Sequence, residues 1–292
     1  MKNFIFSVAA CATLTACTVP PREFDESHSM AWNVARAGGI YDIQDKELSA
    51  EDFNRINRFE YGYNTAYWGL EMASGPFFSM DWSNALLAGV VLSMFEPDKP
   101  AAQNSVLSWM PKHMAADEEQ ARQKLLEIYK QSISRSLKEL GFEYSEHTVN
   151  GAPNAVYYLF WSDEPEMNCK PLNELPALQK GDFCGVYFAV NRVQAYRTSP
   201  IIANLSELNP LDPVWLVTGN SQQSYLYVSS GDKSTPPNDV IINKVSENLP
   251  DWNFIYTTGN LKRSGKNANN NSIPMSYLSH KGKPMFFVVE KS

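Results

Sequence analysis

The chain is poor in the residues that mark a catalytic centre or a nucleic-acid surface. Its 292 residues include only four histidines and four cysteines, and 25 basic against 32 acidic side chains give a formal charge of −7. No basic block offsets this charge, so we expect no nucleic acid as a partner and no docking on anionic lipid by charge. An apolar fraction of 43% is nevertheless ample for a packed core.

Catalytic motifs are also missing from the sequence. It contains no G-x-S-x-G elbow, no H-E-x-x-H, no S-x-x-K with its partner motifs and no phosphate-binding glycine loop. His28, His113 and His280 are expected in a tether, a connector and a hairpin loop. His147, at the end of a predicted strand, is the one histidine well placed for a site. A plain surface or edge-strand position explains it better, because no spaced carboxylate or cysteine accompanies it.

An acidic loop is the one candidate for a metal site. Oxygen-rich clusters of this kind can bind calcium, but the spacing lacks the alternating ligands and the glycine of a known calcium loop. We therefore interpret the loop as solvated, and predict no metal and no cofactor. Its carboxylates are the weak candidates Asp163, Glu164, Glu166 and Asp182.

After the N-terminal segment, no uninterrupted apolar stretch approaches the 18 residues that a membrane-spanning helix needs. The N-terminus itself has Lys2 followed by an apolar stretch from Phe4 to Ala12, typical of a secretory signal peptide and too short to span a bilayer. The stretch ends in Leu14-Thr15-Ala16-Cys17, which resembles the lipobox of bacterial lipoproteins.

This resemblance implies a diacylglycerol thioether on Cys17, cleavage before it and acylation of the new amine, for example with palmitate. Several acyl chains would anchor the protein stably, since each buried methylene contributes about 0.8 kcal/mol. Thr18 stands where an Asp usually signals retention in the inner membrane, which favours the outer membrane. The plainer alternative is an ordinary signal peptide in which Cys17 is incidental.

The remaining cysteines predict a disulfide. Cys11 would leave with the signal peptide and Cys17 would carry lipid, so Cys169 and Cys184 are the pair left in an oxidising compartment. Closing the loop between them contributes roughly 3 kcal/mol in the chain-entropy model. Two metal-ligating thiols are the alternative, but CxxC spacing and a nearby histidine are missing.

Prolines, glycines and changes in the apolar pattern divide the chain into four segments. Residues 1–16 form the signal peptide, 17–29 a lipid-anchored tether, 30–110 a helical portion and 111–292 an α+β domain. Within the helical portion, Ser49 and Asp52 resemble a capping box. A strongly apolar helix is expected from Asn84 to Phe95, either buried between other helices or docked on a partner or membrane.

The clearest single element is a helix from Glu118 to Leu140. Apolar residues recur along it at three- and four-residue steps, Asp117 is a good N-cap, and Gly141 followed by Phe142 fits a left-handed C-terminal turn. A second helix is expected from Asp239 to Leu249, capped by Asn238 or Asp239.

After Gly141 the period changes to two, which indicates strands. Tyr157 to Trp161 is apolar at every position and predicts a central strand covered on both faces. Ser279 to Lys283 is expected to be the last hairpin loop. The predicted strands cover residues 142–146, 155–161, 186–193, 214–218, 224–228, 252–257, 275–278 and 285–289.

The sequence thus predicts an α+β fold in which a helical N-terminal portion precedes a mostly antiparallel β-sheet packed with helices. Two functions stay open. The first is a non-enzymatic lipoprotein on the periplasmic side of a membrane, contacting an envelope protein of a secretion or conjugation machine, or of an incoming toxin or transfer system. The second is a periplasmic enzyme or small-ligand binder whose site joins distant residues, with His147 and residues 163–182 as its candidate location.

Overall fold

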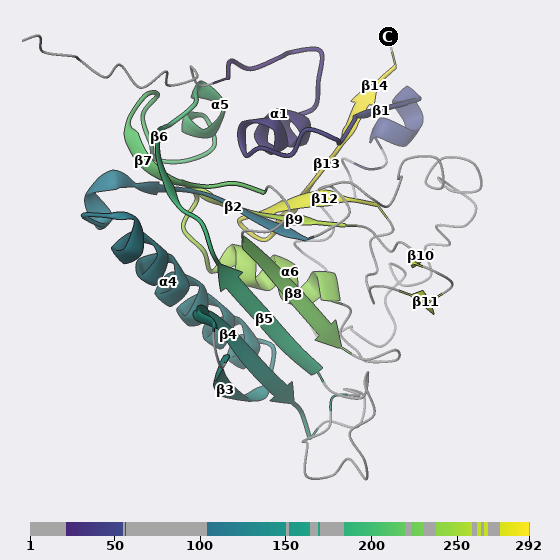
Figure 1. Cartoon of the computed structure of the whole chain (residues 1–292). Helices are drawn as coiled ribbons and strands as arrows, with labels where there is room; N and C mark the ends of the chain where they lie inside the picture. Colours follow the sequence, from purple (N-terminus) through teal and green to yellow (C-terminus); the bar gives the residue numbers. More distant parts are fainter. Residues whose placement is uncertain are drawn as a thin grey trace, which may run out of the picture.

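The computed structural model has the predicted α+β fold, with helices packed on mostly antiparallel sheets (Figure 1). Cys17 and the predicted helix from Asn84 to Phe95 lie outside the residues that the structure describes. Those residues are 22–54, 56, 104–149, 152–163, 169, 184–219, 224–230, 238–258, 262–263, 266–267 and 275–291.

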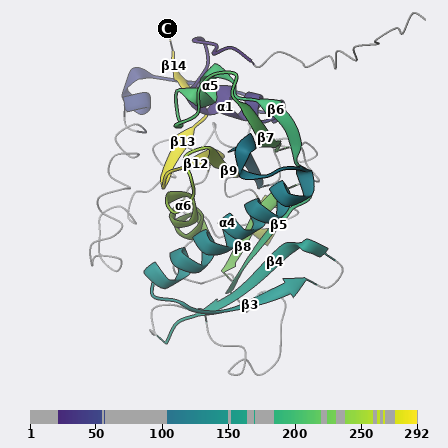
Figure 2. The same ribbon diagram turned by 90° about the vertical axis from the view of Figure 1, so that its left-hand side faces the viewer.

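One sheet has four antiparallel strands in the order β3-β4-β5-β8. The helix α4 (Glu118–Glu139) lies along one face of it (Figure 2). The rings of Tyr129 and Phe188 stack there with their centroids 4.1 Å apart. This face buries alternate strand residues, as period-two patterning requires. The strands are β3 (Glu143–Val149), β4 (Ala152–Trp161), β5 (Cys184–Val190) and β8 (Ser224–Ser230).

The predicted limits of α4 are confirmed by its caps. Asp117 accepts a hydrogen bond from the backbone N–H of Gln120 at 2.8 Å, which satisfies one of the free amides of the first turn. At the other end Gly141 has φ +79°, and the N–H of the buried Phe142 donates to the carbonyl of Leu137. This is the left-handed turn that the sequence predicts.

The strand β4 is central, as predicted, but it is not fully covered on both faces. Val156, Tyr158 and Phe160 are buried against α4, whereas Tyr157, Leu159 and Trp161 on the opposite face are only half-buried. The run of large apolar residues therefore marks one packed face and one partly open face. Gly185 is required there, because a Cβ at that position would lie 2.4 Å from the hydroxyl of Tyr157.

A second sheet has six antiparallel strands in the order β13-β12-β9-β2-β7-β6. Strand β2 lies near its centre, between two strands that follow it by about a hundred residues or more. The sequence pattern predicts no strand in this region. The strands are β2 (Ser105–Pro111), β6 (Gln194–Arg197), β7 (Pro213–Val217), β9 (Asn253–Thr257), β12 (Tyr277–His280) and β13 (Lys283–Phe286).

The N-terminal residues are part of the same body. Helix α1 (Met30–Ala37), capped by Ser29, packs beside the short α5 (Pro200–Ala203), and β1 (Lys46–Leu48) pairs in parallel with β14 (Val288–Glu290). The described part of the portion expected to be helical thus contains α1, helical residues 50–54 and two strands. A small separate pair, β10 (Lys262–Arg263) and β11 (Lys266–Asn267), completes the strands described.

Helix α6 (Asn238–Glu247) confirms the second predicted helix and lies between the two sheets, in contact with β8, β9 and β12 (Figure 1). It also packs on α4 through two small residues. Ser132 donates to the carbonyl of Val245 at 2.7 Å and Ser136 to that of Lys244 at 3.0 Å. Both carbonyls, at the end of α6, also accept hydrogen bonds from the backbone N–H of Asn248, so the serines add a second donor to each. A single core cluster joins buried residues of both sheets.

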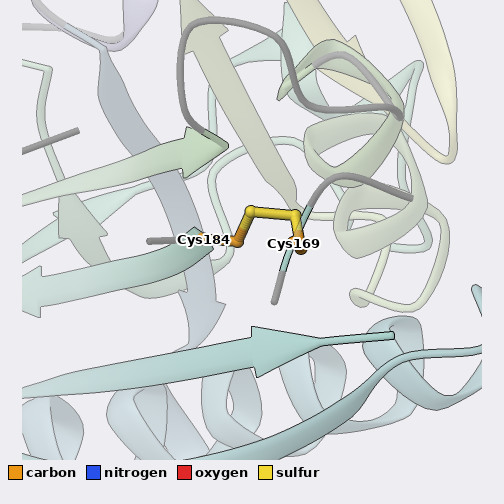
Figure 3. Close-up of a disulfide and its surroundings, with 2 residues drawn as sticks. All are labelled: Cys169 and Cys184. Carbon is orange, nitrogen blue, oxygen red and sulfur yellow. A yellow bond between two sulfur atoms is a disulfide. The ribbon is translucent and has the colours of Figure 1, made fainter. Parts of the chain in front are cut away.

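The predicted disulfide joins Cys169 to Cys184 at the start of β5 (Figure 3). Their Cα atoms lie 5.5 Å apart and both side chains are buried. The N–H of Ser162, just after β4, donates to the carbonyl of Cys169 at 3.0 Å. The bond therefore ties the segment that follows β4 to the neighbouring strand.

Candidate functional site

Four separate segments meet at one end of the six-stranded sheet and enclose a groove of about 760 Å³. They are the end of β2 with the 3-10 turn after it (Lys112–Met114), the loop before β7, the turn between α6 and β9, and the β12–β13 turn. The described residues that line it are Pro111, Lys112, His113, Glu207, Leu208, Asp212, Pro213, Leu249, Pro250, Asp251, Trp252 and Lys281.

The apolar part of the groove is rigid. Leu249 and Trp252 are buried, and the carbonyl of Trp252 accepts a hydrogen bond from the N–H of Trp109 in the neighbouring strand β2 at 3.0 Å. Prolines 111, 213 and 250 fix the backbone φ of three of the four segments. The walls are therefore preformed, which lowers the entropy lost when a ligand binds.

One cation of the groove is held over an aromatic ring. The Nζ of Lys112 lies 3.0 Å from the centroid of the Trp215 ring, and the indole N–H of Trp215 donates to the carbonyl of Ala115 at 3.0 Å. Cation–π contacts of this kind contribute about 0.5–2 kcal/mol. The contact fixes the position of a positive charge at the rim.

Two carboxylates of the groove hold its own walls together. Asp251 accepts a hydrogen bond from the N–H of Glu207 at 3.0 Å, and Asp212 accepts from the N–H of Asn209 at 3.2 Å. The Nζ of Lys281 lies 3.9 Å from Asp251. Their charge-assisted bonds fix the loop of residues 204–212.

The backbone of that loop is strained at its tip. Leu211 has φ +68°, which a branched side chain rarely adopts, and its N–H donates to the carbonyl of Thr198 at 2.9 Å. Its side chain is 52% exposed although it is large and apolar. Strained backbone and an exposed apolar side chain together are typical of binding loops.

The expected position of His280 is wrong. Only Lys281 and Gly282, with φ of +50° and +78°, form the hairpin turn, so His280 is the last residue of β12 and is buried. Its Nε2 donates to the carbonyl of Asp251 at 2.7 Å. Burial lowers the pKa of His280, and the hydrogen bond to Asp251 opposes that shift. The neutral ring thus supports the turn that carries Asp251.

The structure describes two of the polar residues suggested for a site, His147 and Asp163. His147 is exposed on β3, with its Nε2 2.8 Å from the hydroxyl of Ser145, in the sheet that does not carry the groove. Asp163 lies just after β4, while Glu164, Glu166 and Asp182 lie outside the described residues. Across the part of the chain that the structure describes, no three His, Cys, Asp or Glu side chains gather as metal ligands.

His28 differs from its expected place, whereas His113 lies in a connector as predicted, in the turn between β2 and α4. The Nδ1 of His28 lies 3.0 Å from Asp45, and its ring stacks on Trp32, so it is folded against α1 instead of lying in a loose tether. His113 stands exposed at the rim of the groove.

Sequence reasoning missed the charged residues of the groove. One signal was present: Lys112, Asp212 and Asp251 each stand next to a proline, at the end of β2, at the start of β7 and in the turn before β9. The described lining contains no serine, threonine or cysteine, so it offers no nucleophilic hydroxyl or thiol. The site is suited to binding, with a rigid apolar floor and fixed charges of both signs at the rim.

No family model, curated protein or solved structure matches the chain. None of the helices within the described residues is both long enough and apolar enough to cross a bilayer.

Proposed function

We propose that this chain is a lipoprotein of the bacterial cell envelope, anchored by an acylated Cys17 to the periplasmic face of the outer membrane. The support is the order of Lys2, the apolar stretch and Leu14-Thr15-Ala16-Cys17 at the N-terminus. The buried disulfide between Cys169 and Cys184 agrees with an exported, oxidising location.

Its function in this proposal is to bind another envelope protein through the groove, without catalysis. The observation that carries this is the lining of the groove, in which the buried Leu249 and Trp252 lie beside the charge of Lys112, held over the Trp215 ring. Rigid prolines, the apolar Leu249 and Trp252 and the fixed charges suit an extended polypeptide segment that bears both charged and apolar side chains. A component of a secretion or conjugation machine, or of an incoming toxin or transfer system, could supply it.

A small-ligand binder is the second candidate, since a volume of about 760 Å³ is within the range of small-molecule pockets. The two candidates differ in what contacts the rim. A protein partner must also touch residues outside the cavity such as Leu211, whereas a small ligand is held by the lining alone.

The anchor is tested by the Cys17→Ser variant. We expect the parent to carry acyl mass on its mature N-terminus and to fractionate with membranes, and the variant to lose both. A variant that stays membrane-bound as firmly as the parent would overturn the anchor.

The groove is tested by a photo-reactive amino acid placed at Lys281 or Leu211, with Thr148 on β3 as the control position. We expect one discrete cross-linked protein from the first two positions and none from the third. Lys281→Glu should abolish the adduct formed from Leu211, while Lys283→Glu, in the same hairpin but outside the lining, should leave it intact. Adducts that do not respond to Lys281→Glu would remove the groove as the binding site.

A further inference from the structure

The tether to the lipid anchor is shorter than the sequence suggests. Residues 17–29 are expected to be a free tether, but the N–H of Asp25 donates to the side chain of Asn33 at 2.8 Å, and the amide of Asn33 donates to the carbonyl of Asp25 at 2.9 Å. Asn33 is buried in α1. The chain is therefore already attached to the folded body by Asp25.

This attachment limits how far the body can lie from the bilayer. Arg22, whose guanidinium lies over the Tyr41 ring, is five residue steps from Cys17, and a fully extended chain spans at most about 3.6 Å per step, or about 18 Å here. If Cys17 is acylated, the surface around Arg22 must therefore lie at or near the lipid headgroups.

A group of exposed and half-buried aromatic and arginine side chains occupies this surface. We call it the Tyr41 cluster, formed by Arg22, Trp32, Arg36 and Tyr41 together with the exposed Phe24, two residues from Arg22 in the chain. The guanidinium carbons of Arg22 and Arg36 lie 5.5 and 5.2 Å from the centroid of the Tyr41 ring, and that of Arg36 lies 4.9 Å from Trp32.

Its exposure is unusual within this molecule. Tyr41 is 55% exposed and Phe24 39%, and Leu211 is the third large apolar side chain found exposed in the described residues. Two of these three thus lie within 24 residues of Cys17. Tyrosine and tryptophan favour the interface between lipid and water, and arginine can keep its charge among the headgroups while its stem contacts apolar groups.

The charges nearby indicate which lipid surface fits. The two arginines of the cluster are flanked in sequence by Glu23, Asp25, Glu26 and Asp42, so the region has no net positive charge. Attraction to anionic lipid is therefore not the source of binding. Burial of the aromatic rings in the interface of a zwitterionic bilayer is the interaction that remains.

We infer that the Tyr41 cluster rests on the bilayer in which Cys17 is anchored, and so fixes the orientation of the body. The inference rests on the proposed lipid anchor. In Figures 1 and 2, α1 and β3 lie at opposite ends of the molecule, so this orientation directs the four-stranded sheet away from the membrane.

The test uses the lipidated full chain in phosphatidylcholine vesicles, with a nitroxide on Tyr41→Cys or, as the matched control, on the exposed Thr148→Cys of β3. Power-saturation measurements compare the access of oxygen and of a water-soluble nickel complex to each label. We expect the ratio of oxygen to nickel access to be several-fold higher at residue 41 than at residue 148, and to be unchanged by added salt.

Equal ratios at the two positions in a protein that sediments with the vesicles would overturn the inference and leave the anchor standing. The Cys17→Ser form of the same labelled protein separates the two claims. If it stays in the supernatant, the anchor holds and the label ratios of the lipidated chain decide the orientation. If the Cys17→Ser protein sediments like the parent, the proposed anchor is wrong. A low ratio of oxygen to nickel access at residue 41 would then also overturn the inferred contact between the Tyr41 cluster and the bilayer.

Discussion

The two sheets differ in how their central strands are paired. In the four-stranded sheet the central β4 pairs with β3 and β5, its neighbours along the chain, whereas in the six-stranded sheet the central β2 pairs with the distant β7 and β9 and places Ser105 opposite Tyr256. Local pairing gives a regular sheet with one helix on its face. Long-range pairing brings the ends of distant segments together, and the groove forms where they meet.

Different assembly does not mean separate stability. One cluster of buried side chains runs through both sheets, and α6 packs on strands of each. We therefore expect the two halves to unfold as one cooperative unit, although only one of them carries the candidate site.

The largest expected effects come from removing a core ring in either half. Phe188→Ala in the four-stranded sheet and Phe254→Ala in the six-stranded sheet each empty a fully buried position. Each should lower the free energy of unfolding by about 3–5 kcal/mol. Urea unfolding followed by tryptophan emission and by far-UV circular dichroism should show coincident transitions for both variants.

The exposed Leu211 supplies the control, because Leu211→Ala should change the free energy of unfolding by less than about 0.5 kcal/mol. Two separate transitions in either core variant would show that the halves are independent, against the single core described above.

The next largest effect is expected from the disulfide, which lies in the half that contains the four-stranded sheet. Reducing the bond between Cys169 and Cys184, which are 15 residues apart, should lower the free energy of unfolding by about 3 kcal/mol. Urea unfolding with and without reductant measures this loss. In the Cys169→Ala/Cys184→Ala protein the reductant should have no effect. If reductant destabilises the double variant equally, the loss has another source.

The same contrast explains what the sequence could predict. The limits of α4 follow from Asp117, Gly141 and the apolar spacing between them, all of which are local signals. Strand β2 lacks such signals. Its buried Ser105 and Ser108 interrupt the apolar pattern, and they are accommodated only by neighbours that the chain supplies much later.

The groove was beyond local reasoning for the same reason. Its charged residues come from four segments, and none of them forms a motif within its own segment. His280 was misplaced because Ser279 to Lys283 is polar throughout, while the turn needs only the two residues with positive φ. The identity of Cys17 as a lipid attachment site, by contrast, is a purely local pattern and stays a prediction.

Replacing one glycine in each half by alanine compares the backbone strain at the two positions. Gly282, in the β12–β13 turn, has φ +78° and a Cβ there would lie 3.1 Å from the Cβ of Glu247. Gly141, beside α4, has φ +79° with open space around it. We expect Gly141→Ala to cost about 1 kcal/mol from strain alone and Gly282→Ala about 2 kcal/mol, since the contact adds to the strain.

Thermal and urea unfolding of both variants would measure the difference. Equal losses would mean that the contact with Glu247 relaxes at no cost and that the turn beside the groove is no more constrained than the end of α4.

The smallest expected effect comes from the polar contacts between α4 and α6. Burial raises the pKa of Glu139, but hydrogen bonds from Arg135, Asn248 and Lys244 outweigh it and lower the pKa to about 2. Because the folded pKa lies below the unfolded value of 4.5, the carboxylate stabilises the fold above pH 4.5. That stabilisation is lost as the pH falls from 4.5 towards 2.

A third of the Glu139 side chain is exposed, so solvent screening limits the contribution to less than about 1 kcal/mol. Urea unfolding across this pH range should show a shallower loss of stability for Glu139→Gln than for the parent. Glu127→Gln, on the exposed side of the same helix, should follow the parent curve. If both variants follow the parent curve, the hydrogen bonds of Glu139 do not contribute to the coupling of α4 to α6, and apolar packing alone joins the two halves.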